Sequence, residues 1–503
     1  MNVAHADMAD VVPNVDASTL RWRLGVLVAI VGAGDFLLFR HSLGLSVALF
    51  AGVVEIATVL AAGVNRRKAI VCALVGLATL APVIEDVNTL SLAIALCGAG
   101  TLALIANGGI TGSFAEWVLQ VLEFLAAGPF HMLLDIPEVG SKVLIRRFSG
   151  RALIAWALPI GLGGVFLALF SAANPVVEAW LAAIDIRPLL ALLDIWRLSF
   201  WLALLALVWP FVMFRSLKQG DGGSSKPKTV CAKSSAPGDF LTMFFGEAAI
   251  LRSLTIFNGM FAVQTMLDVA ILWRRHSLPA DVSFASYAHR GAYPLVATAL
   301  LAGAFVVLAM RPGSAASRSP LIRTLVYVWI GQNVALVISS LYRLELYVQV
   351  YSLTYWRLAA FIWTGLVAIG LVLVIAQLST QRSNRWLLSA NVVAAMAALY
   401  LCGFANFDYL IADYNLRHCR EVSSGSAALD MDYLESLGPD AIPAVDAALS
   451  KPGSPLASGR LMSVRSTIDM AQQSRPDDWR SWTFRKWRLS RYLEAETGTS
   501  TKP

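Results

Sequence analysis

The stretch LAAFIWTGLVAIGLVLVIAQL, from Leu358 to Leu378, contains no charged side chain. A helix over this stretch is about 30 Å long, because each residue adds about 1.5 Å, and this length matches the apolar core of a bilayer. Ten further apolar runs resemble it: Leu24–Phe39, Leu43–Gly63, Ala69–Ile84, Leu90–Ala106, Ala152–Ala172, Trp196–Phe214, Ser253–Trp273, Gly291–Met310, Thr324–Tyr342 and Trp386–Phe404. The sequence therefore predicts an all-α polytopic membrane bundle of about 11 transmembrane helices.

Two of these runs are short for a membrane crossing. A spanning helix needs roughly 20 residues, whereas Ala69–Ile84 and Leu90–Ala106 are shorter. Residues 69–106 can therefore span twice or form a re-entrant hairpin, and the sequence leaves both alternatives open.

Charge divides the chain into a membrane part and a C-terminal part. Charged residues make up 15% of the chain, well below the roughly 25% of a typical soluble domain. Residues 405–503 hold 25 of the 73 charged side chains, 12 basic and 13 acidic. We therefore predict a disordered N-terminal segment over residues 1–20, a transmembrane domain over 21–404 with a flexible Gly-, Ser- and Lys-rich linker at 216–239, and a helical extramembrane tail over 405–503.

The positions of Lys and Arg predict the orientation. With a cytoplasmic N-terminus, 20 basic residues lie in or near the cytoplasmic loops and eight on the opposite side, as the positive-inside rule requires. Eleven crossings then place the tail outside the cytoplasm. The net charge of +7 comes from the membrane part, which indicates contact with anionic lipid headgroups rather than with nucleic acid.

Motifs of known chemistry are absent from the sequence. It contains no G-x-x-x-x-G-K-[ST] phosphate loop, no H-E-x-x-H zinc site and no G-x-S-x-G nucleophile elbow. The six histidines are scattered, so we expect no metal and no cofactor. Cys402 and Cys419 could meet outside the cytoplasm as a disulfide, but their spacing does not decide between a disulfide and two free thiols.

Several polar side chains lie inside the apolar runs, where each is costly unless it faces protein or water. Asp268 shares a helical face with Asn258, Phe261, Gln264 and Thr265, which predicts a polar stripe that points into the bundle. Hydrogen bonds between helices and the lining of a functional site are the two explanations of such a stripe. The intramembrane polar residues that we single out are Asp35, Glu55, Gln264, Gln332 and Asn333.

The predicted topology also brings several polar groups to one outer level. This candidate outer cluster consists of Asp268, His289, Arg290, Arg343, Arg357, Tyr351 and Tyr355. As a site, the arginines would hold an anionic lipid headgroup or a small anion, with tyrosine hydroxyls completing the hydrogen bonds. As a structural feature, the same residue types mark the membrane boundary, where they are enriched in general.

Two segments outside the runs have helical patterns of their own. Residues 108–150 contain apolar residues at spacings of three and four from Phe114 onwards, typical of an interfacial helix or of core packing. In the tail, Gly438 and Pro439 end a short helix that begins near Leu429, and Ala441–Leu449 begins another. The stretch from Trp479 to Leu493 predicts one basic, aromatic-rich helix that lies on the membrane or packs into the tail.

Four stretches carry a resemblance to a known family. They are YAHRGAYPLVATALLAGAFVVLAMRPGS (287–314), YSLTYWRLAAFIWTGLVAIGLVL (351–373), DMDYLESLGPDAIP (430–443) and DWRSWTFRKWRL (478–489). They resemble a family of bacterial multi-pass inner-membrane proteins that is catalogued only as a domain of unknown function. The resemblance covers most of residues 150–495. It implies an inner-membrane protein with an all-helical core, and it implies no activity, cofactor or catalytic residue.

These observations rank three functions. A non-enzymatic, transport- or envelope-associated role comes first, because large helical bundles with buried polar stripes serve passage or recognition. A membrane-embedded transferase for a lipid-linked substrate comes second, with His289 as base and the arginines as anion clamps. A membrane sensor that relays a signal from the outer tail comes third. The sequence does not identify a substrate, a protein partner or an oligomeric state.

Overall fold

The computed structural model describes residues 17–108, 112–143, 159, 194–214, 247–270, 301, 319–422, 427–451, 456, 459–473 and 478–500. Throughout these ranges the regular secondary structure is helical, and they contain no strand. The all-α prediction is therefore confirmed. The chain forms two compact units, one made of Met1–Thr111, Trp117–Gly222 and Asp478–Thr483, the other of Gly112–Glu116, Gly223–Asp477 and Phe484–Pro503.

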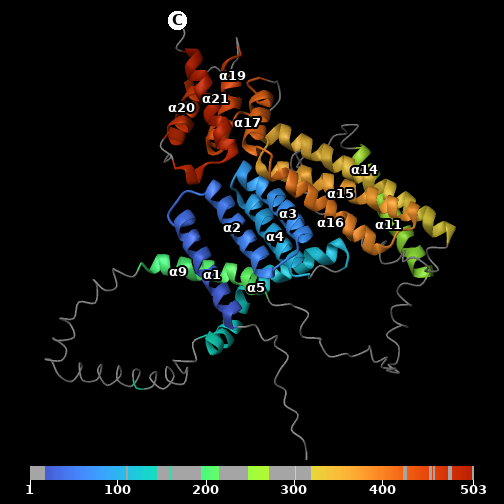
Figure 1. The fold of residues 1–503 in the computed structure, drawn as a ribbon. Coiled ribbons are helices and arrows are strands. Elements are labelled where there is room, and N and C mark those ends of the chain that lie inside the picture. The colour runs from blue at the N-terminus through green and yellow to red at the C-terminus, as the bar shows by residue number, and fades with distance from the viewer. Residues whose placement is uncertain are drawn as a thin grey trace, which may run out of the picture. The chain divides into compact units, whose positions relative to one another are not determined.

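Unit 1 is a bundle of mostly apolar helices. In chain order these are α1 (Ala17–Leu38), α2 (Leu45–Ala62), α3 (Arg66–Glu85), α4 (Thr89–Ala106), α5 (Phe114–Val143, of which the part from Trp117 belongs here), α9 (Ile195–Val212) and the 3₁₀ turn η3 (Trp479–Ser481). α2 packs against α1, α3, α4 and α9, so it lies at the centre of the unit (Figure 1).

Tight polar connections explain the antiparallel arrangement of α2, α3 and α4. Gly63 ends α2 with a left-handed backbone (φ +59°), a conformation that glycine adopts at little cost. Asn65 then caps α3, because its side chain accepts a hydrogen bond from the Lys68 amide at 3.0 Å. Asn88 and Ser91 form a reciprocal capping box at the start of α4. Such short connections leave each helix beside the one before it.

The described residues of unit 2 form four long helices and the helices of the tail. The long helices are α11 (Glu247–Asp268), α14 (Pro320–Tyr351), α15 (Tyr355–Thr380) and α16 (Asn384–Cys402). α11 packs on α14, α14 on α15, and α15 on α16 (Figure 1). With 32 residues, α14 is about 48 Å long, so it extends beyond the roughly 30 Å apolar core of a bilayer.

The tail is a small helical domain with its own core. It contains α17 (Phe407–His418), α18 (Met431–Ser436), the 3₁₀ turn η2 (Pro439–Ala441), α19 (Ile442–Leu449), α20 (Gly459–Gln473) and α21 (Phe484–Ser500). Ile411, Ile442 and Leu461 are fully buried in this core, which also takes in Val348 near the end of α14 and Leu353 after it. The hydrophobic core of the tail therefore includes residues at the C-terminal end of α14, the part of this helix that extends beyond the apolar layer of a bilayer.

Eight helices in the described ranges are long and apolar enough to cross a membrane. They are α2, α3, α4, α9, α11, α14, α15 and α16. α3 and α4, which cover the two short runs, have 20 and 18 residues. α1 is a helix over the first run but is not among the eight. The runs Ala152–Ala172 and Gly291–Met310, the N-terminal segment 1–16 and most of the linker 216–239 lie outside the described residues.

The prediction of one helix from Trp479 to Leu493 is wrong. η3 ends at Ser481, and α21 begins only at Phe484. Asp478 caps η3, and Trp482 is extended (φ −62°, ψ 135°), with its carbonyl oxygen accepting a hydrogen bond from the Leu45 amide at 2.7 Å. This hydrogen bond outside the segment holds the backbone out of the helical conformation. Cys402 at the end of α16 and Cys419 of the tail are free thiols.

Candidate functional site

The most deeply buried charges in the described chain form an ion pair between α11 and α14. Arg343 donates to Oδ1 of Asp268, and the side chains of these residues are 2% and 0% exposed. Gln264, one turn earlier on α11, donates its amide hydrogen to the same oxygen at 2.9 Å. The second oxygen, Oδ2, is buried and has no hydrogen-bond partner among the described residues. Removing two charges from water costs several kcal/mol per ion, so each charge stabilises the other here.

Amide side chains extend this polar seam along the two helices. Asn258 donates to the carbonyl oxygen of Leu325 on α14 at 3.1 Å, and Gln332 donates back to the carbonyl oxygen of Asn258 at 3.1 Å. Asn333 donates to the carbonyl of Trp329 within α14 at 2.8 Å. Asn258 and Asp268 are ten residues apart, about 15 Å along α11. The seam therefore links the two helices over about half the thickness of a bilayer core.

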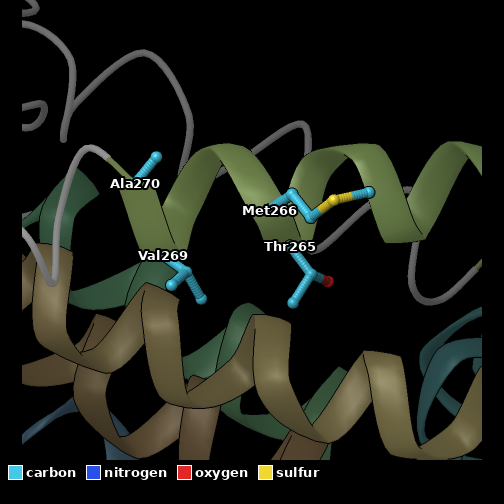
Figure 2. A pocket seen from close by; sticks show the side chains of 4 residues that line it. All are labelled: Thr265, Met266, Val269 and Ala270. Atoms are coloured by element: carbon cyan, nitrogen blue, oxygen red, sulfur yellow. The ribbon is translucent and has the colours of Figure 1, made fainter.

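A pocket lies beside the same end of α11. Its volume is about 260 Å³, and its described lining consists of Thr265, Met266, Val269 and Ala270. Figure 2 shows Thr265 and Val269 pointing toward the neighbouring helices, whereas Ala270 points the other way. The Thr265 hydroxyl donates to the carbonyl of Phe261 at 2.8 Å. This described lining supplies space and apolar surface near the end of α11, and it includes neither member of the ion pair.

Arg357, in the first turn of α15, contacts the C-terminal end of α14, whereas Arg343 lies further back within α14. Nη1 of Arg357 donates to the carbonyl oxygens of Tyr351 and Ser352, and the Arg357 guanidinium lies 4.6 Å from the centre of the Tyr347 ring. These carbonyls end α14, so Arg357 acts as a C-terminal cap. Arg343 precedes Tyr351 by eight residues, about 12 Å along the helix.

The remaining members of the predicted outer cluster are placed as follows. The Tyr355 hydroxyl donates to Asp408 of the tail, and its backbone amide donates to the Tyr433 hydroxyl at 3.2 Å. His289 and Arg290 lie outside the described residues. The structure thus brings together Asp268 and Arg343, and separately Arg357 and Tyr351; a single cluster of all these residues stays a prediction.

Asp35 of unit 1 takes part in a second ion pair. Arg197 at the start of α9 donates to its carboxylate through both Nε, at 2.9 Å, and Nη2, and Trp201 donates its indole hydrogen at 2.9 Å. Arg40 pairs with Asp194 at 2.9 Å nearby. The Asp35 and Arg197 side chains are 15% and 48% exposed, so this pair fastens α1 to α9 at the edge of the unit.

Sequence reasoning missed Arg197 and Trp201 as partners of Asp35. The signal was present, because Asp35 lies near the end of its run and Arg197 near the start of another, both on the predicted outer side. Glu55 differs from Asp35 and Asp268. It is 6% exposed in the middle of α2, no ion pair involving it occurs among the described residues, and its Oε2 lies against Gly76 of α3.

The comparisons with known proteins give a family and no activity. No curated protein and no solved structure matches the chain. The family described as a domain of unknown function, DUF4153, matches residues 69–448, which is well over half of the chain and begins further toward the N-terminus than the four motifs indicate. The chain therefore belongs to the DUF4153 family of unknown function.

Proposed function

We propose that this protein has a non-enzymatic transport role in the bacterial inner membrane, and that Arg343 binds the anionic group of a small solute. The observation that carries the proposal is the Asp268–Arg343 ion pair, buried between two helices that are apolar and long enough to cross a membrane. Ionisable groups inside membrane helices are costly, and they mark substrate and ion pathways.

The chemistry of the pair suits an exchange of partners. A guanidinium binds a carboxylate or a phosphate through two parallel hydrogen bonds. An incoming anion can therefore accept hydrogen bonds from Arg343 in place of the Asp268 carboxylate. When the anion replaces Asp268, the released carboxylate stays in apolar surroundings and takes up a proton, because the neutral form is cheaper there. The proposed cycle therefore couples one anion to one proton.

The surroundings of the pair support this role over the alternatives. A pocket large enough for a small solute lies on α11 within one turn of Asp268 along the helix, although Asp268 itself does not line it. A sensor with a loosely attached outer domain has less support, because the tail shares one core with residues at the end of α14.

The proposed orientation, with a cytoplasmic N-terminus and the tail on the opposite side, follows from the excess of basic residues in the loops assigned to the cytoplasm.

The test uses the full chain in liposomes adsorbed to a solid-supported membrane. Succinate is the probe, because it carries two negative charges against the one proton of the cycle, and a jump in its concentration should produce a transient current. The doubly neutral variant Asp268→Asn/Arg343→Gln, which leaves no buried charge unbalanced, should lose the current by tenfold or more. Arg323→Gln, a change of an exposed arginine in the first turn of α14, is the matched control and should retain it. A wild type without a succinate current, or a double variant with undiminished current, contradicts the proposal.

A further inference from the structure

Among the described residues, Glu55 is the one carboxyl in the mainly apolar contact of α2 with α3 and α4, which we call the seam of unit 1. The side of α2 that packs on α3 and α4 presents residues at spacings of three and four, namely Ala48, Ala51, Glu55, Val59 and Ala62. On one side of Glu55, Ala48 packs with Leu80, Val83 and Ala95. On the other side, Val59 and Ala62 pack with Cys72, Leu102 and Ala106. Apolar contacts therefore enclose the carboxyl from both directions along the helix.

The carboxyl lies at the mid-depth of two candidate membrane spans. Glu55 is the eleventh of 18 residues in α2, and Gly76 is the eleventh of 20 in α3. A methyl group at Gly76 would overlap Oε2 of Glu55, so glycine makes room for the carboxyl at this contact. A methyl group at Gly98 of α4 would overlap the Thr79 side chain in the same way. Small residues thus bring the three helices close together, as in other membrane bundles, and Glu55 is 6% exposed.

The Glu55 carboxyl has no cation beside it in the described chain. Its Oε1 is buried without a hydrogen-bond partner among the described residues. Lys68 on α3 is two helical turns from Gly76, about 12 Å. Arg23 on α1 donates to the carbonyl of Ala61, six residues beyond Glu55. The other ionisable groups of the packed elements are Arg21 and Asp35 on α1, Arg66, Arg67, Cys72 and Glu85 on α3, Cys97 on α4, Arg197 on α9, and Asp478 and Arg480 at η3.

We propose that Glu55 is a proton-binding site at mid-membrane, neutral while α2, α3 and α4 are packed and charged only when water enters the seam. An ionised carboxylate without a partner is far more costly in apolar surroundings than a carboxylic acid. Proton binding therefore stabilises the packed seam, and proton release loosens it. This site belongs to unit 1, and the proposal stands independently of the role assigned to Arg343.

A proton suits this site better than a metal cation. The nearby hydroxyls are engaged along their own helices, since Thr58 donates to the Val54 carbonyl at 2.7 Å and Thr79 to the Val75 carbonyl at 3.0 Å. In the ranges that the structure describes, no three His, Cys, Asp or Glu side chains gather to hold a metal ion. A sodium ion needs several converging oxygen atoms, whereas a proton needs only the carboxylate itself.

Dicyclohexylcarbodiimide, an apolar reagent for protonated carboxyls, tests the proposal on the full chain in liposomes. The acid adds across one C=N bond, its proton passes to nitrogen, and the adduct rearranges to a stable N-acylurea without losing any group. Peptide mass spectrometry should find the adduct at Glu55, with a yield that falls several-fold between about pH 6 and about pH 9. Glu55→Gln should abolish this adduct, and the exposed Glu123 of α5 serves as the control carboxyl.

Infrared spectroscopy supplies a second readout that does not require the reagent to enter. A protonated Glu55 contributes a C=O stretching band that disappears at high pH and is absent from Glu55→Gln but retained in Glu123→Gln. Glu55→Gln imitates the neutral acid, so its melting temperature at low pH should equal that of the wild type. At higher pH, the melting temperature of Glu55→Gln should lack the decrease that ionisation of Glu55 causes in the wild type. Absence of both the adduct and the band near pH 6 overturns the proposal, and so does protection of Glu55 by sodium ions at constant pH.

Discussion

Arg343 of α14 and Asp268 of α11 neutralise each other in a place that water does not reach, with 2% and 0% of their side chains exposed. The two residues are 75 positions apart in the chain. Their pairing therefore fixes the rotation and the depth of α11 against α14, in addition to any part it has in binding. Gln264 strengthens the arrangement by donating to the oxygen that Arg343 also contacts.

Breaking this pair on one side should destabilise the protein strongly. Asp268→Asn or Arg343→Gln leaves the other charge buried and alone, and we expect a loss of about 3–5 kcal/mol in the free energy of unfolding. The double apolar variant Asp268→Leu/Arg343→Met should lose much less, because no charge remains to be compensated. Thermal unfolding in detergent measures both, with Leu267→Ala, an apolar change at an exposed position of α11, as the control. If the double variant Asp268→Asn/Arg343→Gln loses the sum of the two single losses, a direct interaction is contradicted.

The amide contacts between α11 and α14 should contribute less to the free energy of unfolding than the Asp268–Arg343 ion pair does. Asn258→Leu removes the hydrogen bond to the Leu325 carbonyl and is expected to cost about 0.6–1.7 kcal/mol, the range for hydrogen bonds between membrane helices. Asn391→Leu is the comparison, because the Asn391 amide donates to the Leu387 carbonyl on its own helix at 2.9 Å. A double-mutant cycle of Asn258 with Gln332 gives the coupling between the helices. A coupling near zero would show that the contact does not hold the helices together.

The sequence pattern predicts well how deep a residue lies along its membrane helix, and poorly which neighbouring helix that residue faces. Asp268, Gln264 and Asn258 were expected on one face pointing into the bundle, because isolated polar groups among apolar residues are costly in lipid. Arg343 was expected at the same outer level as Asp268. The pairing itself could not be derived, since an apolar run shows how far a residue lies along a helix, and not which neighbouring helix it faces.

The end of α14 shows why the outer cluster was harder to predict than the spans. The apolar run ends at Tyr342, so the polar residues beyond it resembled a loop. The helix instead continues to Tyr351 and ends at Ser352, whose backbone is left-handed (φ 68°). Val348 is buried against the tail, which supplies the apolar contacts that lipid no longer provides. Arg357, predicted to hold an anion, caps this prolonged helix.

Alkaline pH should weaken the contact between Tyr414 of the tail and Glu345 of α14. Burial, together with the Glu345 carboxylate that accepts the Tyr414 hydroxyl hydrogen at 3.4 Å, raises the pKa of Tyr414 from 10.0 to about 12. The folded state therefore favours the neutral phenol. This stabilisation is fully present below pH 10 and is lost as the pH rises through about 12.

The melting temperatures of wild type and Tyr414→Phe should consequently converge between pH 10 and pH 12. Differential scanning fluorimetry over this range measures the difference, and taking a difference removes the effect of other groups that titrate in both proteins. Tyr409→Phe on the same helix is the matched control. A difference between wild type and Tyr414→Phe that does not change with pH would contradict the raised pKa.

Topology can be tested at both ends of the predicted arrangement. An alkaline phosphatase reporter fused after Pro503 should be active, since it folds only outside the cytoplasm, whereas one inserted near Ser224 in the linker should be inactive. A fluorescent reporter that folds in the cytoplasm should give the opposite result at each place. Inverted activities at both places would overturn the orientation derived from the basic residues.

Gly44 provides the most direct test of how η3 packs in unit 1. Its backbone is extended (φ −172°), so any residue could adopt the conformation, but a methyl group would overlap the backbone of Ser481. The neighbouring Leu45 amide donates to the Trp482 carbonyl at 2.7 Å, and Arg480 donates to the Phe36 carbonyl at 3.2 Å. Two backbone segments therefore meet here without space for a side chain.

Gly44→Ala should consequently displace residues 478–483 from the start of α2. We expect a loss of about 1–3 kcal/mol in the free energy of unfolding, the usual cost of overfilling a packed contact. Hydrogen exchange should also become faster at the Leu45 amide, which loses its acceptor. Gly25→Ala in α1 is the control, because no atom lies within 4 Å of the added carbon and alanine favours a helix, so this variant should be as stable as the wild type or more stable. Equal melting temperatures and equal exchange rates for Gly44→Ala and the wild type would mean that η3 does not press against α2, and the hydrogen bond from Leu45 to Trp482 would lose its structural role.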